Sequence, residues 1–225
     1  ESAFAPEDSI PDIPATLPWA RQPAAVEPAP PKPLAPSRPT TEDPPVAAPL
    51  GQTQTTRFQR GLLIHRLLQS LPDLPIDSRR AAATAFLARP VWSLTPEDAS
   101  AITDETLAVL EHDDFAALFG PGSKAEVPVT GLINGHVLSG QVDRLVVTDR
   151  DVMIIDYKTN RPPPRTAEAV NPAYQFQMAA YRAALAEIYP DRTIRCVLLW
   201  TDGPFITELP EAMLDAVWDR DGHHG

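Results

Sequence analysis

The sequence predicts an α/β fold in which helices flank a mixed central sheet. Apolar side chains recur at helical spacing over residues 57–118, and the spacing changes to a period of two over residues 126–158. A long helical segment at 171–189 is then followed by two further apolar strands and a last helix. This order of elements is typical of an α/β domain whose sheet contains both parallel and antiparallel strand pairs.

The first part of the domain is expected to be helical. Residues Arg57–Leu71 place Ile64, Leu68 and Leu71 along one apolar stripe, and Pro72 ends the helix. Acidic residues then mark the starts of later helices, where the helix dipole favours negative charge. Three further helices are expected. One spans 79–88 after a cap at Asp77 or Ser78, one begins at Thr95 or Pro96 and ends at Leu110, and one spans 113–118.

Three strands follow and are predicted to form an antiparallel meander. They are Glu126–Leu132, Val137–Val147 and Val152–Lys158, and all three are rich in Val, Ile and Leu. Asn134-Gly135 and residues 148–151 supply the turns between them. The remaining elements are a loop at 161–165, a helix at 171–189 capped by Asn171, strands at 193–201 and 205–208, and a helix at 211–219.

Proline divides the chain into two regions. The first 50 residues hold 14 of the 27 prolines, which removes too many N–H donors for ordinary helix or sheet. Residues 1–55 are therefore expected to be a disordered linker, and residues 56–225 a single domain with a helical part (56–120) and a catalytic core (121–225). Because the chain begins without Met inside this proline-rich stretch, we expect it to be a piece of a longer protein.

Charge and cysteine content exclude several classes of protein. With 30 acidic and 19 basic residues the net charge is −11, so a protein that grips nucleic acid through its overall field is excluded. The lone Cys196 cannot form an internal disulfide, a zinc cage or an iron–sulfur cluster. No apolar run is long enough to span a membrane, and the expected location is the cytoplasm.

Three charged residues stand where strands should be apolar. Asp143 interrupts the second predicted strand, and Asp156 and Lys158 end the third, two positions apart and therefore on one face. The short turn between the strands can bring Asp143 beside Asp156. Burying a carboxylate costs free energy unless the carboxylate is paired, and a Mg²⁺ or Mn²⁺ ion is a suitable partner because it takes carboxylate oxygens as ligands. The alternative is a structural Asp–Lys pair with an unrelated acid near a turn.

The pattern of these residues resembles the PD-(D/E)XK signature of RecB-type nucleases. Gly140-x-x-Asp143-Arg144 is followed by Asp156-Tyr157-Lys158-Thr159, as in that family. Two further pieces match, namely His65 on the first predicted helix and the motif Tyr174-x-x-Gln177-x-x-x-Tyr181 on the helix after the lysine strand.

The resemblance implies a restriction-endonuclease-like core and a set of site residues. It places the metal, Mg²⁺ or Mn²⁺, on His65, Asp143, Asp156 and the backbone carbonyl of Tyr157, with Lys158 as the catalytic lysine. It also implies that Gln177, Tyr181, Tyr174 and Arg144 contact DNA or support the site. Glu126 is left open, as a site member or a solvated edge acid. From their proximity to the motifs, the basic residues Arg144, Arg161, Arg165 and Arg182 are also expected to guide the DNA strand.

Two segments of the sequence resemble the C-terminal nuclease domain of AddA-type helicase–nucleases in particular. They are Arg60 to Pro72 and Asp156 to Pro163. This resemblance implies double-strand-break repair by recombination, with helicase domains earlier in the same parent chain, an AddB-like partner, and a single DNA strand fed from a duplex end. The chain itself lacks the G-x-x-x-x-G-K-[ST] phosphate loop, so no ATP site is expected in it. The alternatives are a stand-alone RecB-family exonuclease and an inactive nuclease-like scaffolding module.

Overall fold

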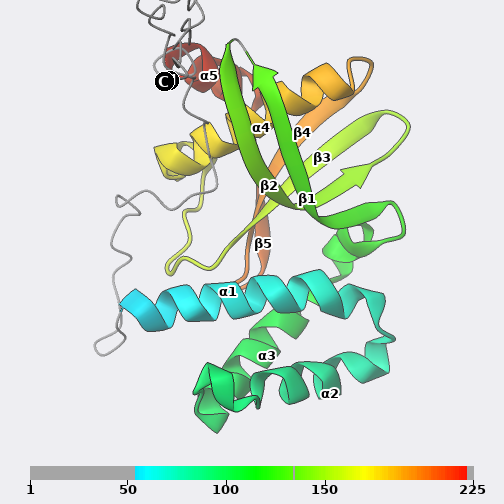
Figure 1. The fold of residues 1–225 in the computed structure, drawn as a ribbon, viewed down its shortest axis with the longest axis vertical. Helices are drawn as coiled ribbons and strands as arrows, with labels where there is room; N and C mark the ends of the chain where they lie inside the picture. The colour runs from blue at the N-terminus through cyan, green and yellow to red at the C-terminus, as the bar shows by residue number, and fades with distance from the viewer. Residues whose placement is uncertain (1–53, 134, 222–225) are drawn as a thin grey trace, which may run out of the picture. The chain divides into compact units, whose positions relative to one another are not determined.

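A computed structural model describes residues 54–133 and 135–221 of the chain (Figure 1). The predicted linker at 1–55 lies almost entirely outside these residues, as do Asn134, His223 and His224. These residues form five α-helices: α1 (Gln54–Ser70), α2 (Ile76–Leu87), α3 (Pro96–Leu110), α4 (Pro172–Ile188) and α5 (Glu211–Asp221). Short 3₁₀ segments join α1 to α2 and α2 to α3.

The five strands of the described region form one mixed sheet in the order β1-β2-β3-β4-β5. β1, β2 and β3 pair antiparallel, which confirms the predicted meander. β3 pairs parallel with β4, and this pairing requires a long crossover, which α4 supplies. The bounds are β1 (Ser123–Ile133), β2 (His136–Val147), β3 (Asp151–Lys158), β4 (Thr193–Trp200) and β5 (Phe205–Leu209).

Helices cover both faces of the sheet, so β3 and β4 are apolar on both sides. Ile154 and Leu198 belong to the buried cluster that includes Met178 of α4. Ile155 and Val197, their immediate neighbours on β3 and β4, belong to the second cluster, which includes residues of α1 to α3. Figure 1 shows α4 on one side of the sheet and the layer of α1, α2 and α3 on the other.

Several element boundaries differ from the sequence-based expectations. α2 begins at Ile76 after Pro75, so Asp77 and Ser78 lie inside its first turn and do not cap it. Proline is favoured near a helix start because it lacks the donor that an internal position needs. The segment Asp113–Phe119 is a 3₁₀ helix, and β1 starts at Ser123 because it pairs there with Val146. The predicted start of α3 is confirmed: Pro96 is its first residue, and Thr95 caps it by accepting from Asp98 N. The predicted cap at Asn171 is confirmed as well, since its side chain accepts from Ala173 N.

At one point along the β1–β2 hairpin, the side chains change the face of the sheet to which they point. The ladder pairs Ala125 with Arg144 and Val127 with Val142 but skips the position between them, where Glu126 has φ 54°. Residues two apart on a regular strand share a face. Here, however, Val142 packs in the α4-side cluster while Arg144 binds the carbonyl of Leu68 on α1. Both strands therefore rotate at this position, and the sheet is locally open there.

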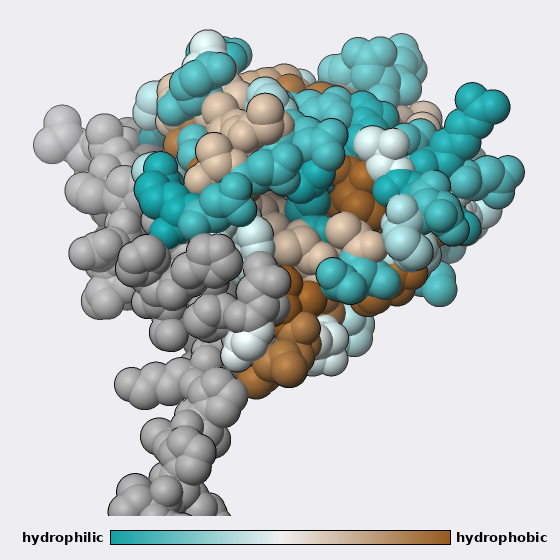
Figure 2. All heavy atoms as spheres, turned by 90° about the horizontal axis from the view of Figure 1, so that it is seen from above, coloured by the Kyte–Doolittle hydropathy of each residue, from teal (hydrophilic) through white to brown (hydrophobic). Residues whose placement is uncertain are grey.

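Polar side chains predominate on the face of the described region that Figure 2 shows. Apolar ones occupy smaller areas of this face. The most exposed large apolar side chains are Val91, Leu132 and Phe58, which belong to different elements, as is ordinary for a globular domain. Among the described residues, no helix has the length and apolar character needed to cross a membrane.

Candidate active site

The site lies where β2 separates from β3. Pairing of these strands stops at Arg144 with Ile155, so the next position along each strand, Asp143 and Asp156, faces an opened ladder. The Asp143 carboxylate takes the place of a strand carbonyl, because its Oδ2 accepts the backbone N–H of Tyr157 at 2.7 Å. The structure thus brings the two carboxylates together as the sequence predicts.

Lys158 and Asp156 form a buried ion pair that a glutamine holds from the other side. Lys158 Nζ lies 2.5 Å from Asp156 Oδ2. The Gln177 amide of α4 donates to Asp156 Oδ1 at 3.0 Å and accepts from Lys158 Nζ at 3.2 Å. Lys158 Nζ also lies 3.9 Å from the centre of the Tyr174 ring, within the range of a cation–π contact. Asp156, Lys158, Gln177 and Tyr174 therefore form one connected group.

His65 reaches the same opening from α1. Its Nδ1 lies 3.3 Å from Asp143 Oδ1, and its ring meets the Tyr157 ring edge-on at 5.5 Å. The helix therefore delivers His65 to Asp143 from the face of the sheet opposite α4.

Tyr181 supports β2 just before Asp143. Its hydroxyl accepts from Gln141 N and donates to Gln141 O, both at 3.0 Å, and its side chain is fully buried. A Cβ on Gly140 would lie 2.4 Å from this hydroxyl, so only glycine fits there. Tyr181 therefore acts on the shape of the strand.

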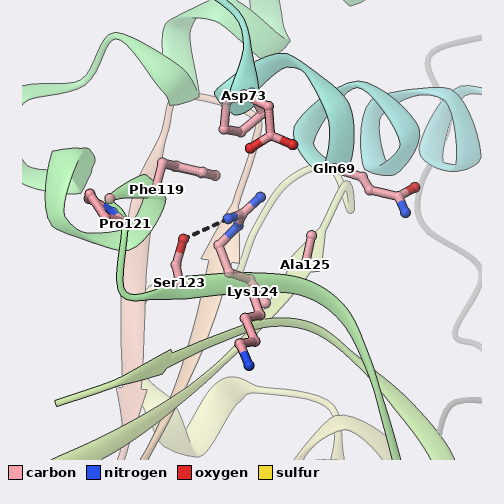
Figure 3. A pocket seen from close by; sticks show the side chains of 10 residues that line it. Gln69, Asp73, Phe119, Pro121, Ser123, Lys124 and Ala125 are labelled. Carbon is pink, nitrogen blue, oxygen red and sulfur yellow. Dashed lines mark hydrogen bonds between the residues drawn. The ribbon is translucent and has the colours of Figure 1, made fainter.

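Arg144 is a buried tie between elements. It is 3% exposed and donates to Tyr157 Oη, Ser123 Oγ and the Leu68 carbonyl. Binding a carbonyl in the last turn of α1 also suits its positive charge. It lines a cavity of about 720 Å³ beside β1, shown in Figure 3 with the bond to Ser123 dashed. Neither Asp143, Asp156 nor Lys158 lines that cavity.

The other predicted guide residues are already engaged with acids or rings. Arg182 pairs with Glu211 and Asp215 of α5. Arg161 pairs with Glu105 and Asp202, and the Arg165 guanidinium lies over the Phe205 ring.

Glu126 stands across the hairpin from Asp143, at the skipped position of the ladder. It is half-buried, and its pKa is raised by burial and by the negative charge of Asp143. Its carbonyl accepts from the Gln141 side chain at 3.2 Å. Glu126 is therefore partly withdrawn from solvent, at the same hairpin opening as Asp143.

Burial and mutual charge set the protonation of the group. Burial raises the pKa of Asp156, and Asp143 adds to the rise although Lys158 opposes it. Burial acts to lower the pKa of Lys158, but Asp156, Tyr174 and Asp143 together outweigh it and the pKa is raised. Burial alone would lower the pKa of His65 and raise that of Asp143. Their mutual attraction reverses both, so the pKa of His65 is raised and that of Asp143 lowered.

Sequence reasoning missed three residues that brace this group. Asn160 Oδ1 accepts from the Tyr174 hydroxyl at 3.3 Å, and Thr201 Oγ1 donates to the buried carboxylate of Glu105 at 2.5 Å. The one available signal was that Glu105 follows Ile102 by three positions, on the helix stripe that the fold buries.

No group of three or more His, Cys, Asp or Glu side chains in the described region is arranged to hold a metal ion. His65 and Asp143 face one another, and Asp156 is turned toward Lys158 and Gln177. Asp156 Oδ2 is buried, and its partner among the described residues is Lys158 Nζ at 2.5 Å. This oxygen keeps lone-pair capacity for a further partner.

Two acids, a lysine and a glutamine at the opening of a mixed sheet define an α/β protein with a charged site suited to phosphodiester chemistry. The family model described as PD-(D/E)XK nuclease superfamily matches residues 44–220, and the chain belongs to that superfamily. Its members are generally hydrolytic nucleases. The fold class predicted from the sequence is thereby confirmed.

Comparison with individual proteins adds little. No curated protein matches the chain. Among solved structures, the crystal structure of SSO0001 is similar over 75% of this chain and 85% of that one, with 19% sequence identity and a TM-score of 0.32.

Proposed function

We propose that the chain is a metal-dependent DNA nuclease that hydrolyses phosphodiester bonds. The observation that carries this proposal is the convergence of Asp143, Asp156 and Lys158 where β2 leaves β3. A purely structural ion pair would need neither the second buried carboxylate nor the opened ladder. Membership of the nuclease superfamily supports the same reaction class.

The donors present are of the kinds that Mg²⁺ and Mn²⁺ accept. Asp143, Asp156 and the Tyr157 carbonyl would hold the ion through oxygen, and His65 would add a nitrogen. Asp156 Oδ2 already contacts Lys158 Nζ, and a carboxylate oxygen has a second lone pair that such an ion would use. When bound, such an ion polarises the phosphate and lowers the pKa of an attacking water.

The remaining residues do the positioning. Lys158 keeps its proton, because Asp156 raises its pKa, and its ammonium is placed to neutralise charge that grows on the phosphate. Gln177 fixes Lys158 and Asp156 relative to one another through its two hydrogen bonds. The buried surroundings strengthen these electrostatic contacts.

We further infer that the chain is the C-terminal nuclease part of an AddA-like helicase–nuclease that acts in the cytoplasm. In this role an AddB-like subunit is the partner, and the complex resects duplex ends for recombinational repair. The order of the motifs around His65 and Asp156–Pro163 supports this reading. After residue 50 the chain has 23 acidic and 16 basic residues, an excess of 23 − 16 = 7 negative charges. A domain this acidic would depend on a motor and a partner to deliver the strand.

The nuclease proposal is tested with the full chain, single-stranded DNA, and Mg²⁺ or Mn²⁺. We expect Lys158→Ala and Asp156→Asn each to lower kcat by about 10²-fold or more, and EDTA to abolish cleavage. Lys124→Ala is the matched control, because Lys124 is exposed on β1 and touches none of the catalytic groups. Cleavage that persists in both site variants refutes the assignment, and an inert wild-type chain that binds no Mn²⁺ favours the scaffolding alternative.

The parent assignment has a separate test. The reading frame upstream of residue 1 is expected to encode helicase motifs, including the phosphate loop that residues 1–225 lack. Co-purification with an AddB-like subunit would support the partner. An isolated reading frame would favour the stand-alone exonuclease.

A further inference from the structure

One buried acid outside the site joins parts of the chain that are far apart in sequence. Glu105 on α3 has a side chain that is 7% exposed. Its Oε2 pairs with Arg60 of α1 and, at 2.5 Å, with Arg161 of the loop after β3. Its Oε1 accepts from the hydroxyl of Thr201, which follows β4, at 2.5 Å. Four segments therefore meet at one carboxylate.

The carboxylate is needed because the two guanidinium groups repel one another. Burial lowers the pKa of Arg60 to about 10, and the positive charge of Arg161 contributes to the decrease. A buried charge is tolerated when it is paired with an opposite charge, and Glu105 is the acid that pairs with Arg60. Without that negative charge the two arginines would move apart, and Arg161, whose side chain is 45% exposed, is free to turn to solvent.

Two partners of Glu105, Arg60 and Thr201, connect it to the candidate site. Arg60 lies on α1 five positions before His65, and the backbone of α1 approaches the loop closely, since a Cβ on Gly61 would lie 3.1 Å from Thr159 Oγ1. On the other side, the backbone N–H of Thr201 donates to the Lys158 carbonyl at 3.0 Å. The Glu105 side chain thus contacts both the helix that carries His65 and Thr201, the residue that is hydrogen-bonded to the Lys158 carbonyl.

We propose that Glu105 is a positioning residue of the nuclease site, which sets α1 against the end of β3. Through Arg60 it fixes the height of His65 over Asp143, and through Thr201 and Arg161 it fixes the chain on either side of Lys158. This role rests on the proposed nuclease function, although the geometry it predicts can be measured without any reaction.

The test uses the full chain with Glu105→Gln, which keeps the shape and removes the charge. The readout is the ring signal of His65 in a proton NMR spectrum, identified by its loss in His65→Gln. We expect this signal to shift in Glu105→Gln, because the ring moves relative to Tyr157. Asp104→Asn is the matched control. It removes a carboxylate one position away, from an exposed pair with Arg80, and is expected to leave the signal in place.

Binding of Mn²⁺ and cleavage of single-stranded DNA are measured on the same variants. We expect Glu105→Gln to lower Mn²⁺ affinity and kcat about tenfold, the scale of losses when residues behind metal ligands are changed. The KM for DNA should not change, because Glu105 is buried. If Glu105→Gln does not fold, Arg161→Gln removes one exposed partner and should give smaller changes of the same sign.

An unshifted His65 signal in the folded Glu105→Gln chain overturns the proposal, whatever the cleavage rate. Equal shifts in Glu105→Gln and Asp104→Asn overturn it as well, since the effect would then be general. The two proposals can also fail separately. If the His65 signal shifts in Glu105→Gln alone but the wild-type chain neither binds Mn²⁺ nor cleaves DNA, the positioning role is upheld and the nuclease function is refuted.

Discussion

Gln177 on α4 binds both members of the Asp156–Lys158 pair on β3, donating to the carboxylate at 3.0 Å and accepting from the ammonium at 3.2 Å. Its side chain is buried, so neither bond is in competition with bulk water. The crossover helix therefore does more than cover the sheet. It orients the two charged groups on which the proposed reaction depends.

Replacing Gln177 with leucine is expected to lower kcat by about 10- to 100-fold, because Asp156 and Lys158 lose their shared bridge. Steady-state cleavage of single-stranded DNA provides the measurement. Gln175→Leu is the control, since Gln175 lies on the same helix but binds the carbonyls of Ala167 and Val170, away from the ion pair. Equal activity in the two variants would show that the bridge is dispensable.

The Tyr174 ring is expected to matter more than its hydroxyl. Tyr174→Phe keeps the aromatic face 3.9 Å from Lys158 Nζ and should retain most of kcat. Tyr174→Leu removes that face and should cost about 0.5–2 kcal/mol, roughly 2- to 30-fold in kcat. Parallel kinetics of the two variants test this, and a larger loss in Tyr174→Phe would instead assign the role to the bond with Asn160.

Gly140→Ala is expected to destabilise the fold by about 1–3 kcal/mol, because the new Cβ would lie 2.4 Å from the fully buried Tyr181 hydroxyl. Urea unfolding gives the measurement. Gly203→Ala tests whether any loss of glycine has this effect: there φ is 64° and nothing lies within 4 Å of the new Cβ. Strain at Gly203 then comes from the backbone alone. A fully stable Gly140→Ala protein would mean that Tyr181 moves freely.

The His65–Asp143 pair predicts a pH dependence of stability. The pKa of His65 is raised above 6.5 in the folded chain, so the native state binds more protons than the unfolded state in that window. Its contribution is complete below about 6.5 and is lost as the pH rises through the folded pKa. The lowered pKa of Asp143 acts only in acid, where its contribution is lost as the pH falls through its folded value.

Urea unfolding of the wild type and of His65→Gln at pH values from about 5.5 to 9 measures this effect, in the range where free histidine titrates. The difference in the free energy of unfolding between the two proteins should shrink as the pH increases. A difference that is constant across the range would mean that His65 does not titrate against Asp143.

The sequence by itself determined the order of the elements and the identity of the main charged residues. Period changes placed the meander and the crossover helix, because alternation and helical spacing are local properties of the chain. Asp143, Asp156 and Lys158 were recognisable as charges inside apolar strands, where only a site or a pair could keep them. Boundaries were less certain. β1 was placed three residues late because its start depends on pairing with Val146, a contact distant in sequence.

Only the tertiary structure decided how those residues meet. The rotation of the hairpin at Glu126 and Asp143, the burial of Arg144 against Leu68, and the meeting of Arg60 and Thr201 at Glu105 all join segments from different elements. Spacing along one chain carries no information on such contacts. Burial and charge neutralisation are properties of the packed interior, and they turned Arg144 from a proposed guide for DNA into a tie between α1 and the sheet.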